Sequence, residues 1–289
     1  MSRREEVLSK IGSVQLMPPA ALEVVRLLQE SDVSIASLTR TIEYDPGLTS
    51  NVLRLANSAY FGCSYQVGSV RDAIFRLGTK SIFRLVMAAG FSSVAQRGIR
   101  GYDLAPGHFW EHSMAVALGV GRLASALGIE VREDLFTSGI LHDIGKIVLG
   151  TYLEVDASPI LAMAVEERVS FEVAEQRVLG IDHAEVGALL FKGWNLPSET
   201  VEAVRWHHQP SGLGKISLEV DLVHLTDALC IMNGIATGVE GLYYKADKEC
   251  VARLSLKNSI AEEVSCHMVS DLKEMLSTFG LGTGMQSGG

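Results

Sequence analysis

Apolar residues recur along most of the chain at the three- and four-residue spacing of helices. No stretch alternates apolar and polar residues for long enough to indicate a strand. The pattern therefore predicts an all-α fold. Roughly the first hundred residues should form short helices, at about 22–30, 34–44, 47–57, 70–78 and 80–90, with longer helices following.

Capping residues sharpen these boundaries. A side chain that accepts a hydrogen bond from the first turn favours a helix start, and glycine favours a stop because it tolerates positive φ. The predicted starts lie at Asp45, Ser69, Ser170, Asp182 and Ser198. The predicted stops lie at Gly78, Gly128, Gly150 and Gly180.

The segment QRGIRGYDLAPG offers a break between the short and the longer helices. We therefore expect an N-terminal helical part over 1–105 and a second helical core over 106–280. The glycine-rich end, 281–289, is expected to be a flexible tail.

Composition narrows the class of protein. The 289 residues are 47% hydrophobic, enough for a sizeable core, and the net charge of −9 makes nucleic acid an unlikely partner. No window approaches the ~20 apolar residues that span a bilayer, and MSRREEVLSK lacks a signal-peptide core. We expect a cytoplasmic protein without a membrane partner, whose four cysteines, lacking any CxxC spacing, stay reduced.

The stretch ILHDIGKIV sets polar groups inside an apolar helix, expected from about Glu133 to Leu149. Spacing in such a helix would bring His142, Asp143 and Lys146 to one side, away from the apolar flank. A buried carboxylate costs several kcal/mol unless it is paired or binds a metal. We expect Gly139 to let another helix approach closely.

Other histidines and one mid-helix aspartate could face the same centre. Taken singly, each is more often a hydrogen-bonded core residue than a ligand. Taken together, imidazoles and carboxylates suit Fe, Mn, Ni, Co or Zn, and a set of this size can hold two ions. The candidates outside 140–148 are His108, His112, His183, His207, His208 and Asp227.

Short motifs in order along the chain resemble the HD superfamily of metal-dependent phosphohydrolases: EHSMAVALG, LHDIGKIVL, DHAEVGALL, RWHHQP and VHLTDAL. LMPPAALEVVRLL, IEYDPGLTSNVLRLANSAYFG and SVRDAIFRLGTKSIFRLV resemble the HDOD branch, an output domain of bacterial signalling proteins. The resemblance implies an HD-type helical bundle preceded by an N-terminal helical subdomain.

The resemblance also implies a ligand set. In the HD superfamily the metal ligands correspond here to His112, His142, Asp143 and Asp227. The HD-GYP branch adds residues that resemble His183, the pair His207 and His208, and a phosphate-binding lysine at Lys146. The expected cofactors are thus divalent ions (Fe, Mn, Ni, Zn or Mg), two in number, with Asp143 between them.

Two departures from the HD-GYP pattern restrict the function. The histidine pair is followed by QPSGLGKISL rather than a run ending in Gly-Tyr-Pro, so the loop for a cyclic dinucleotide is missing. His108 stands where some trinuclear relatives carry glutamate, which argues against a third ion.

Two functions stay open at this point. One is a signalling output that retains the metal centre and contacts a protein partner through its N-terminal helices. The other is a metal-dependent phosphohydrolase acting on a nucleotide or another phosphate ester, with Asp143 and Lys146 as catalytic residues. The sequence leaves a homodimer open as well. His224 is expected to be a hydrogen-bonded core histidine rather than part of the site's surroundings.

Overall fold

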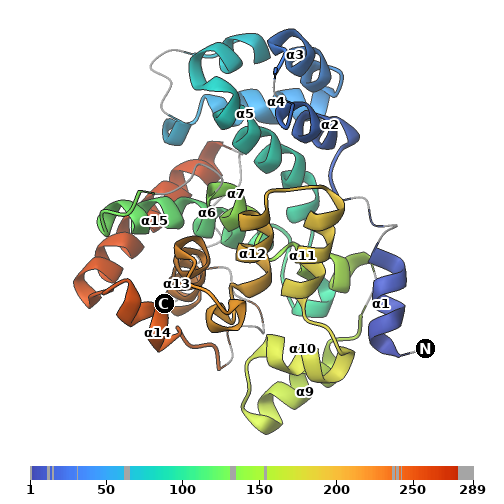
Figure 1. Ribbon diagram of the computed structural model, residues 1–289, viewed down its shortest axis with the longest axis vertical. Helices are drawn as coiled ribbons and strands as arrows, with labels where there is room; N and C mark the ends of the chain where they lie inside the picture. Colours follow the sequence, from blue (N-terminus) through green and yellow to red (C-terminus); the bar gives the residue numbers. More distant parts are fainter. Residues whose placement is uncertain are drawn as a thin grey trace. The chain divides into compact units, whose positions relative to one another are not determined.

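The computed structural model describes residues 2–11, 14, 16–30, 32–61, 66–130, 135–152, 155–235, 238, 241 and 243–278. Figure 1 shows that these residues form helices joined by short connections. The described residues contain no strand, and one isolated bridge pairs Ile99 with Leu104. The predicted all-α fold is confirmed.

The chain divides into two compact units. Unit 1 comprises Met1–Val14 and Val94–Met268, and unit 2 comprises Gln15–Ser93 and Val269–Gly289. Along the sequence the units therefore change over three times, after residues 14, 93 and 268, and the last two changes fall inside long helices. The proposed domain limits at 105 and 280 stay a prediction, and 281–289 lies outside the described residues.

Unit 2 contains most of the predicted short helices. They are α2 (Pro19–Leu28), α3 (Ile35–Glu43), α4 (Pro46–Ala56), the 3-10 turn η1 (Ala59–Phe61) and most of α5 (Val70–Ala95). Helix α5 joins two of the predicted stretches across a kink at Gly78, where φ is +76°. After α4, the Asn57 amide donates to the Val67 carbonyl and accepts from its amide, which fixes the returning chain.

Unit 1 holds the remaining described helices up to Met268, and the helical residues after Met268 belong to unit 2. The segments that carry the predicted ligands are α6 (His108–Ala126), α7 (Leu135–Leu141), α8 (Ile144–Ile147), α11 (His183–Gly193), α12 (Ser198–Trp206) and α13 (Leu218–Met232). The others are α1 (Arg3–Ile11), η2 (Arg100–Tyr102), the π-helical turn η3 (Val148–Tyr152), α9 (Ser158–Glu167), α10 (Phe171–Leu179), η4 (Pro210–Leu213) and α14 (Lys248–Arg253). Helix α15 spans Asn258–Thr278.

Most predicted helix boundaries are confirmed. Helices begin directly after Asp45, Ser69, Ser170 and Asp182, and α10 ends at Gly180 with φ +73°. The start at Ser198 is confirmed, since α12 begins there with Pro197 as its N-cap. The stop at Gly150 is wrong, since this glycine lies inside η3.

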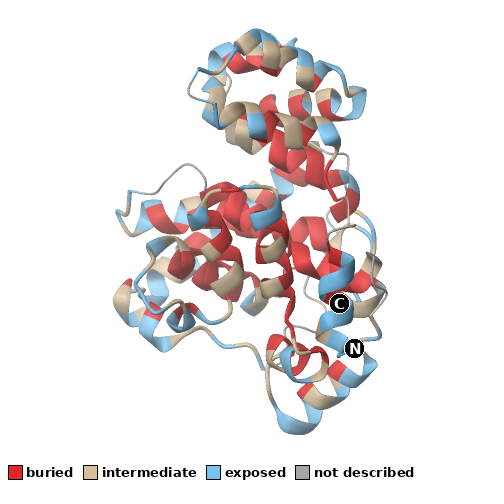
Figure 2. Ribbon diagram, turned by 45° about the vertical axis from the view of Figure 1, so that its right-hand side comes forward, coloured by how far each residue is buried: buried red, intermediate tan, exposed pale blue. Residues whose placement is uncertain are grey.

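The core of unit 1 is built around α6, in which 14 of the 19 residues are buried. Figure 2 shows the buried residues in red on the helices. Helices α6 and α7 pack against each other, as do α6 and α13, and α11 and α12. Close packing depends on glycine. A methyl group on Gly139 would lie 2.8 Å from Ala117 Cα of α6, so the predicted close approach at Gly139 is confirmed.

The continuous helix expected from about Glu133 to Leu149 is wrong. Residues 133 and 134 lie outside the described residues, and the helix ends at Leu141 before α8 begins at Ile144. Asp143 has φ −100° and ψ 9°, outside the helical range. The break lets the neighbouring His142 and Asp143 both face the interior, which the i, i+4 geometry of a regular helix would not allow.

Two further expectations concern membranes and thiols. Within the described ranges, no helix combines the length and apolarity needed to span a bilayer. Cys230, Cys250 and Cys266 are free thiols, and Cys63 lies outside the described residues.

Candidate metal centre

The seven predicted ligands converge inside unit 1. His112 comes from α6, His183 is the first residue of α11, and Asp227 lies on α13. The other four occupy helix ends. They are the pair His142 and Asp143, at the break between α7 and α8, and the pair His207 and His208, directly after α12.

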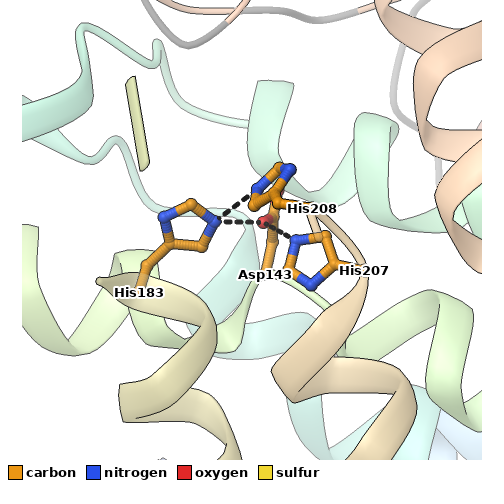
Figure 3. Close-up of side chains that lie close together, drawn as sticks. All are labelled: Asp143, His183, His207 and His208. Carbon is orange, nitrogen blue, oxygen red and sulfur yellow. Dashed lines mark hydrogen bonds and ion pairs between the residues drawn. The ribbon is translucent and has the colours of Figure 1, made fainter. Parts of the chain in front are cut away.

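Asp143, His183, His207 and His208 form a first group, shown in Figure 3. Asp143 Oδ1 lies 3.2 Å from His183 Nε2 and 3.5 Å from His207 Nε2. The Nε2 atoms of His183 and His208 are 2.8 Å apart. The three rings thus direct nitrogen atoms at the space beside one carboxylate oxygen, as Figure 3 shows.

His112, His142 and Asp227 form the second group. Asp227 Oδ1 lies 3.1 Å from His112 Nε2 and 3.7 Å from His142 Nε2. Asp143 also faces this group, because its Oδ2 lies 3.2 Å from His142 Nε2 and 3.7 Å from His112 Nε2. The two oxygens of Asp143 therefore point toward different groups.

Hydrogen bonds on the far side of the rings orient four of the histidines. The Nδ1 of His207 lies 2.7 Å from the Val204 carbonyl, and the Nδ1 of His142 lies 2.8 Å from the Gly139 carbonyl. The remaining two contacts join His112 Nδ1 to the Ile235 carbonyl and His183 Nδ1 to Glu175 Oε2. An Nδ1–H that donates outward leaves the Nε2 lone pair directed at the interior, as a metal requires.

Lys146 completes the surroundings. Its Nζ lies 2.6 Å from Asp143 Oδ2, and its side chain is 2% exposed. Lys146 and Asp143 therefore lie side by side, as their spacing in the sequence predicts. His108, by contrast, is half-buried at the start of α6 and belongs to neither group.

Charge within the centre is distributed unevenly. Burial by itself raises the pKa of Asp143, but His142 and Lys146 outweigh it and hold that pKa well below its usual range. Burial lowers the pKa of His183, yet Glu175 and Asp143 outweigh it and raise that pKa to about 10. Burial lowers the pKa of His207 to about 4. Burial, with His207 and His183 nearby, also holds the pKa of His208 well below its usual range. His207 and His208 are therefore neutral imidazoles near pH 7, the form that binds metals.

The sequence reasoning missed three residues beside the centre. The buried carboxylate of Glu175, on α10, contacts His183, and Tyr102 donates to Glu175. Tyr244, in the segment before α14, packs edge-on against His208 with ring centroids 5.1 Å apart. None of the short motifs contains these residues, so only the tertiary fold places them at the site.

His224 is a hydrogen-bonded core histidine, as expected, but it also contacts the backbone of a candidate ligand, so it does belong to the surroundings of the site. Its Nε2 accepts from the Asp247 backbone amide at 2.7 Å, so its Nδ1 carries the proton. That Nδ1 donates to the His207 carbonyl at 2.6 Å. His224 therefore links α13 to the backbone of the histidine pair.

The donor set fits divalent cations. Polar atoms in a protein interior are nearly always hydrogen-bonded, and an unpartnered one costs about 1–3 kcal/mol. Five buried atoms of the two groups have no hydrogen-bond partner: His142 Nε2, Asp143 Oδ1, His207 Nε2, His208 Nδ1 and Asp227 Oδ2. Buried imidazole and carboxylate atoms that face one another in this way are typical of metal ligands.

A helical protein with a histidine-aspartate pair at a helix break, surrounded by further imidazoles, is an HD-type protein. More narrowly, the chain belongs to the HDOD family, because the HDOD domain matches residues 14–210. The resemblance inferred from the motifs is confirmed. Asp227 lies beyond the matched residues.

Solved structures of similar fold cover nearly the whole chain. A protein named as a candidate phosphohydrolase from Shewanella amazonensis SB2B is 26% identical, with a TM-score of 0.71, and the match covers 94% of this chain and 97% of that one. An HDOD domain protein of unknown function from Geobacter sulfurreducens is 23% identical, with a TM-score of 0.73 and coverage of 96% and 98%. The second likeness supports the fold alone.

Curated relatives match only in part. An uncharacterized protein of Treponema pallidum (strain Nichols) is 25% identical over 70% of this chain, and the match covers 39% of that protein. Ribonuclease Y of Lawsonia intracellularis (strain PHE/MN1-00) is 31% identical over 41% of this chain and 17% of its own length. This chain thus spans well under half of either relative.

Proposed function

We propose that this chain is a bacterial signal-transduction output protein of the HDOD family that retains an HD-type centre for two divalent ions. The five buried, unpartnered donor atoms carry the metal proposal. Two ions would neutralise the two carboxylates and give a partner to His142 Nε2, Asp143 Oδ1 and His207 Nε2. The signalling role rests on membership of the HDOD family.

Each residue has a defined part in this proposal. His183, His207 and His208 would hold one ion with Asp143 Oδ1, and His112, His142 and Asp227 would hold the other with Asp143 Oδ2. Imidazole-rich sets favour Fe, Mn, Ni or Zn over Mg. Two such ions supply Lewis acidity and a water made acidic by coordination.

The closed surroundings favour a regulatory centre over a catalytic one. The exposed fractions of the ligand side chains range from 0% for His142 to 7% for His208. Catalytic sites keep an open coordination position, whereas structural sites are closed. We therefore infer that ion binding sets the conformation and stability of unit 1, and that the output is contact with a signalling protein partner.

Hydrolysis of a phosphate ester is the second candidate, favoured by one feature. Lys146 brings a buried cation to Asp143, which is suited to phosphoryl oxygens as well as to charge balance. A similar structure, from Shewanella amazonensis SB2B, is named as that of a candidate metal-dependent phosphohydrolase. The ligand in this case would be a nucleotide or another phosphate ester.

Metal analysis tests the centre without assuming a substrate. The purified protein, dialysed against Mn²⁺ or Fe²⁺, should hold about two ions per chain. Asp143→Ala should hold fewer than one, because both groups lose a carboxylate oxygen. The control Asp156→Ala removes an exposed carboxylate and should retain two. Equal metal contents in all three proteins would contradict the proposal.

A second experiment separates regulation from catalysis. The loaded protein is assayed on nucleotide phosphodiesters and phosphomonoesters beside Lys146→Met. Signalling without catalysis predicts no turnover in either protein and an unchanged cellular output for the variant. Turnover that falls at least tenfold in Lys146→Met would favour the hydrolase.

A further inference from the structure

Glu175 is a buried carboxylate with every oxygen engaged. It lies on α10 with an exposed fraction of 0%. Its Oε2 accepts from the backbone amide of His183 at 3.0 Å and lies 2.6 Å from His183 Nδ1. Its Oε1 accepts from the Tyr102 hydroxyl. Glu175 thus contacts the far side of a ring whose Nε2 faces Asp143.

The hydrogen-bond partner of His183 Nδ1 differs in charge from the Nδ1 partners of the other three histidines. His112, His142 and His207 each direct Nδ1 at a neutral backbone carbonyl. Among the described residues, His183 is the one candidate ligand whose Nδ1 hydrogen-bonds to a carboxylate. The anionic partner places a negative charge behind one group and not behind the other.

The carboxylate behind His183 compensates for a smaller number of carboxylate ligands in the first group. The second group contains its own carboxylate, Asp227, besides Oδ2 of Asp143. The first group has three imidazoles and only the shared Asp143. Three neutral rings would leave most of the positive charge of a divalent ion uncompensated. A carboxylate that is hydrogen-bonded to one of these rings adds negative charge near the ion without binding it directly.

We propose that Glu175 is a positioning residue that gives the first group its negative charge through His183, and that the Tyr102 hydroxyl moderates this charge. The inference rests on the proposed metal centre. An anion behind a ligand strengthens cation binding and stabilises the more highly charged state of a metal. Glu175 therefore controls the ion of the first group and leaves that of the second unchanged.

Stepwise Mn²⁺ titration of the full chain tests the selectivity. Glu175→Gln preserves the size of the side chain and an oxygen acceptor for His183, but removes the charge. It should weaken one of the two binding steps about 10- to 100-fold and leave the other at its wild-type value. The control Glu167→Gln removes an exposed carboxylate on the neighbouring helix α9 and should leave both steps unchanged.

The redox potential of the iron-loaded protein supplies a readout that a packing defect would not reproduce. Glu175→Gln should raise the midpoint potential of one iron, because removing the anion disfavours the ferric state. Tyr102→Phe should lower it, because Glu175 then directs more of its charge at His183. Opposite shifts from two neighbouring substitutions cannot arise from a common loss of packing.

The outcomes separate this inference from the proposed function. A wild-type protein that binds no Mn²⁺ would overturn the proposed centre, and this inference with it. Two ions bound with wild-type constants in Glu175→Gln, or both steps weakened equally, would overturn this inference alone. Should Glu175→Gln fail to fold, Tyr102→Phe decides: a lowered potential supports the inference, and an unchanged or raised one contradicts it.

Discussion

At the scale of single residues, Lys146 and the proposed metal ions would both neutralise the carboxylate of Asp143. Lys146 Nζ is 2.6 Å from Asp143 Oδ2 and supplies positive charge to a buried carboxylate. Ions held by the two groups would supply the same charge from the other side. The dependence of the fold on Lys146 should therefore change with metal loading.

Lys146→Met makes this measurable. Without metal, the variant should lose about 3–5 kcal/mol of unfolding free energy, because a buried charge loses its partner. With saturating Mn²⁺ the loss should be clearly smaller. Urea unfolding in chelator and in Mn²⁺ checks both values, with exposed Lys192→Met as the control. The same loss in both conditions would show that the ions do not neutralise Asp143.

Glu172 illustrates a carboxylate with the opposite effect on stability. Burial raises its pKa, despite a hydrogen bond from Ser170, so the folded state binds this proton more tightly than the unfolded state does. Its contribution is therefore most favourable at pH values below the unfolded pKa of about 4.3, and falls as pH rises.

Glu172→Gln should consequently raise the melting temperature at pH 7 and have little effect near pH 4. Thermal unfolding of both proteins at the two pH values measures the difference. A variant less stable than wild type at pH 7 would show that the ionised carboxylate makes favourable contacts that outweigh its burial.

At the scale of elements, the site depends on how closely α8 and α11 approach. A Cβ on Gly145 would overlap the backbone carbonyl of His183, and backbone cannot move aside as a flexible side chain does. Gly145→Ala should therefore cost about 3 kcal/mol or more and displace His183. Gly193→Ala, at the end of α11 with open space around it, should be neutral or stabilising by up to ~1 kcal/mol.

Chemical denaturation and metal content together check this prediction. Gly145→Ala should lose both stability and metal, whereas Gly193→Ala should retain both. If Gly145→Ala unfolds at the wild-type denaturant concentration, the close approach at Gly145 is not needed for the fold.

The elements also show which features can be predicted from sequence. The spacing of apolar residues and the caps at Asp45 and Asp182 are local signals, and they fix helices wherever tertiary contacts agree. The break at Asp143 has no such signal, because ILHDIGKIV retains helical spacing on both sides. Gly150 lacked the positive φ expected of a stop, because it packs against Ile99 and Tyr102 inside a π-helical turn.

The candidate site divides in the same way. The seven predicted ligands lie in recognisable motifs, and their convergence agrees with the prediction, although their role as ligands stays a proposal. Glu175 and Tyr102 could not be predicted, because contacts over 73 residues of sequence separation bring them together. Residues that contact a candidate ligand from behind are brought there by tertiary contacts, and short sequence motifs therefore do not predict them.

At the scale of the whole molecule, metal binding should stabilise unit 1 by mass action. An ion that binds only the folded state adds about 2.7 kcal/mol at a concentration 100 times its Kd. Mn²⁺ at that concentration should therefore raise the melting temperature of the wild-type protein by several degrees. Asp143→Ala should show little change, and calorimetry with and without chelator measures the effect. Equal shifts in both proteins would indicate binding elsewhere.

The stability of the protein and its metal binding should both depend on pH through His183. Burial disfavours charge on His183, but Glu175 and Asp143 outweigh it and raise its pKa to about 10. Its unfolded value is about 6.5. The stabilisation from this group is therefore fully present below about pH 6.5, and is lost as pH rises through about 10.

A metal must displace the proton on His183 Nε2, so binding at pH 7 should release about one proton at this group and strengthen as pH rises from 6 to 8. Calorimetric titration with Mn²⁺ in buffers of different ionisation enthalpy measures the number of protons released. Glu175→Gln lowers the pKa of His183 and should reduce that number, while the exposed control Glu167→Gln should not. Binding that releases no protons in the wild-type protein would mean that His183 is not a ligand, and the first group would then have to hold its ion through Asp143 and the histidine pair alone.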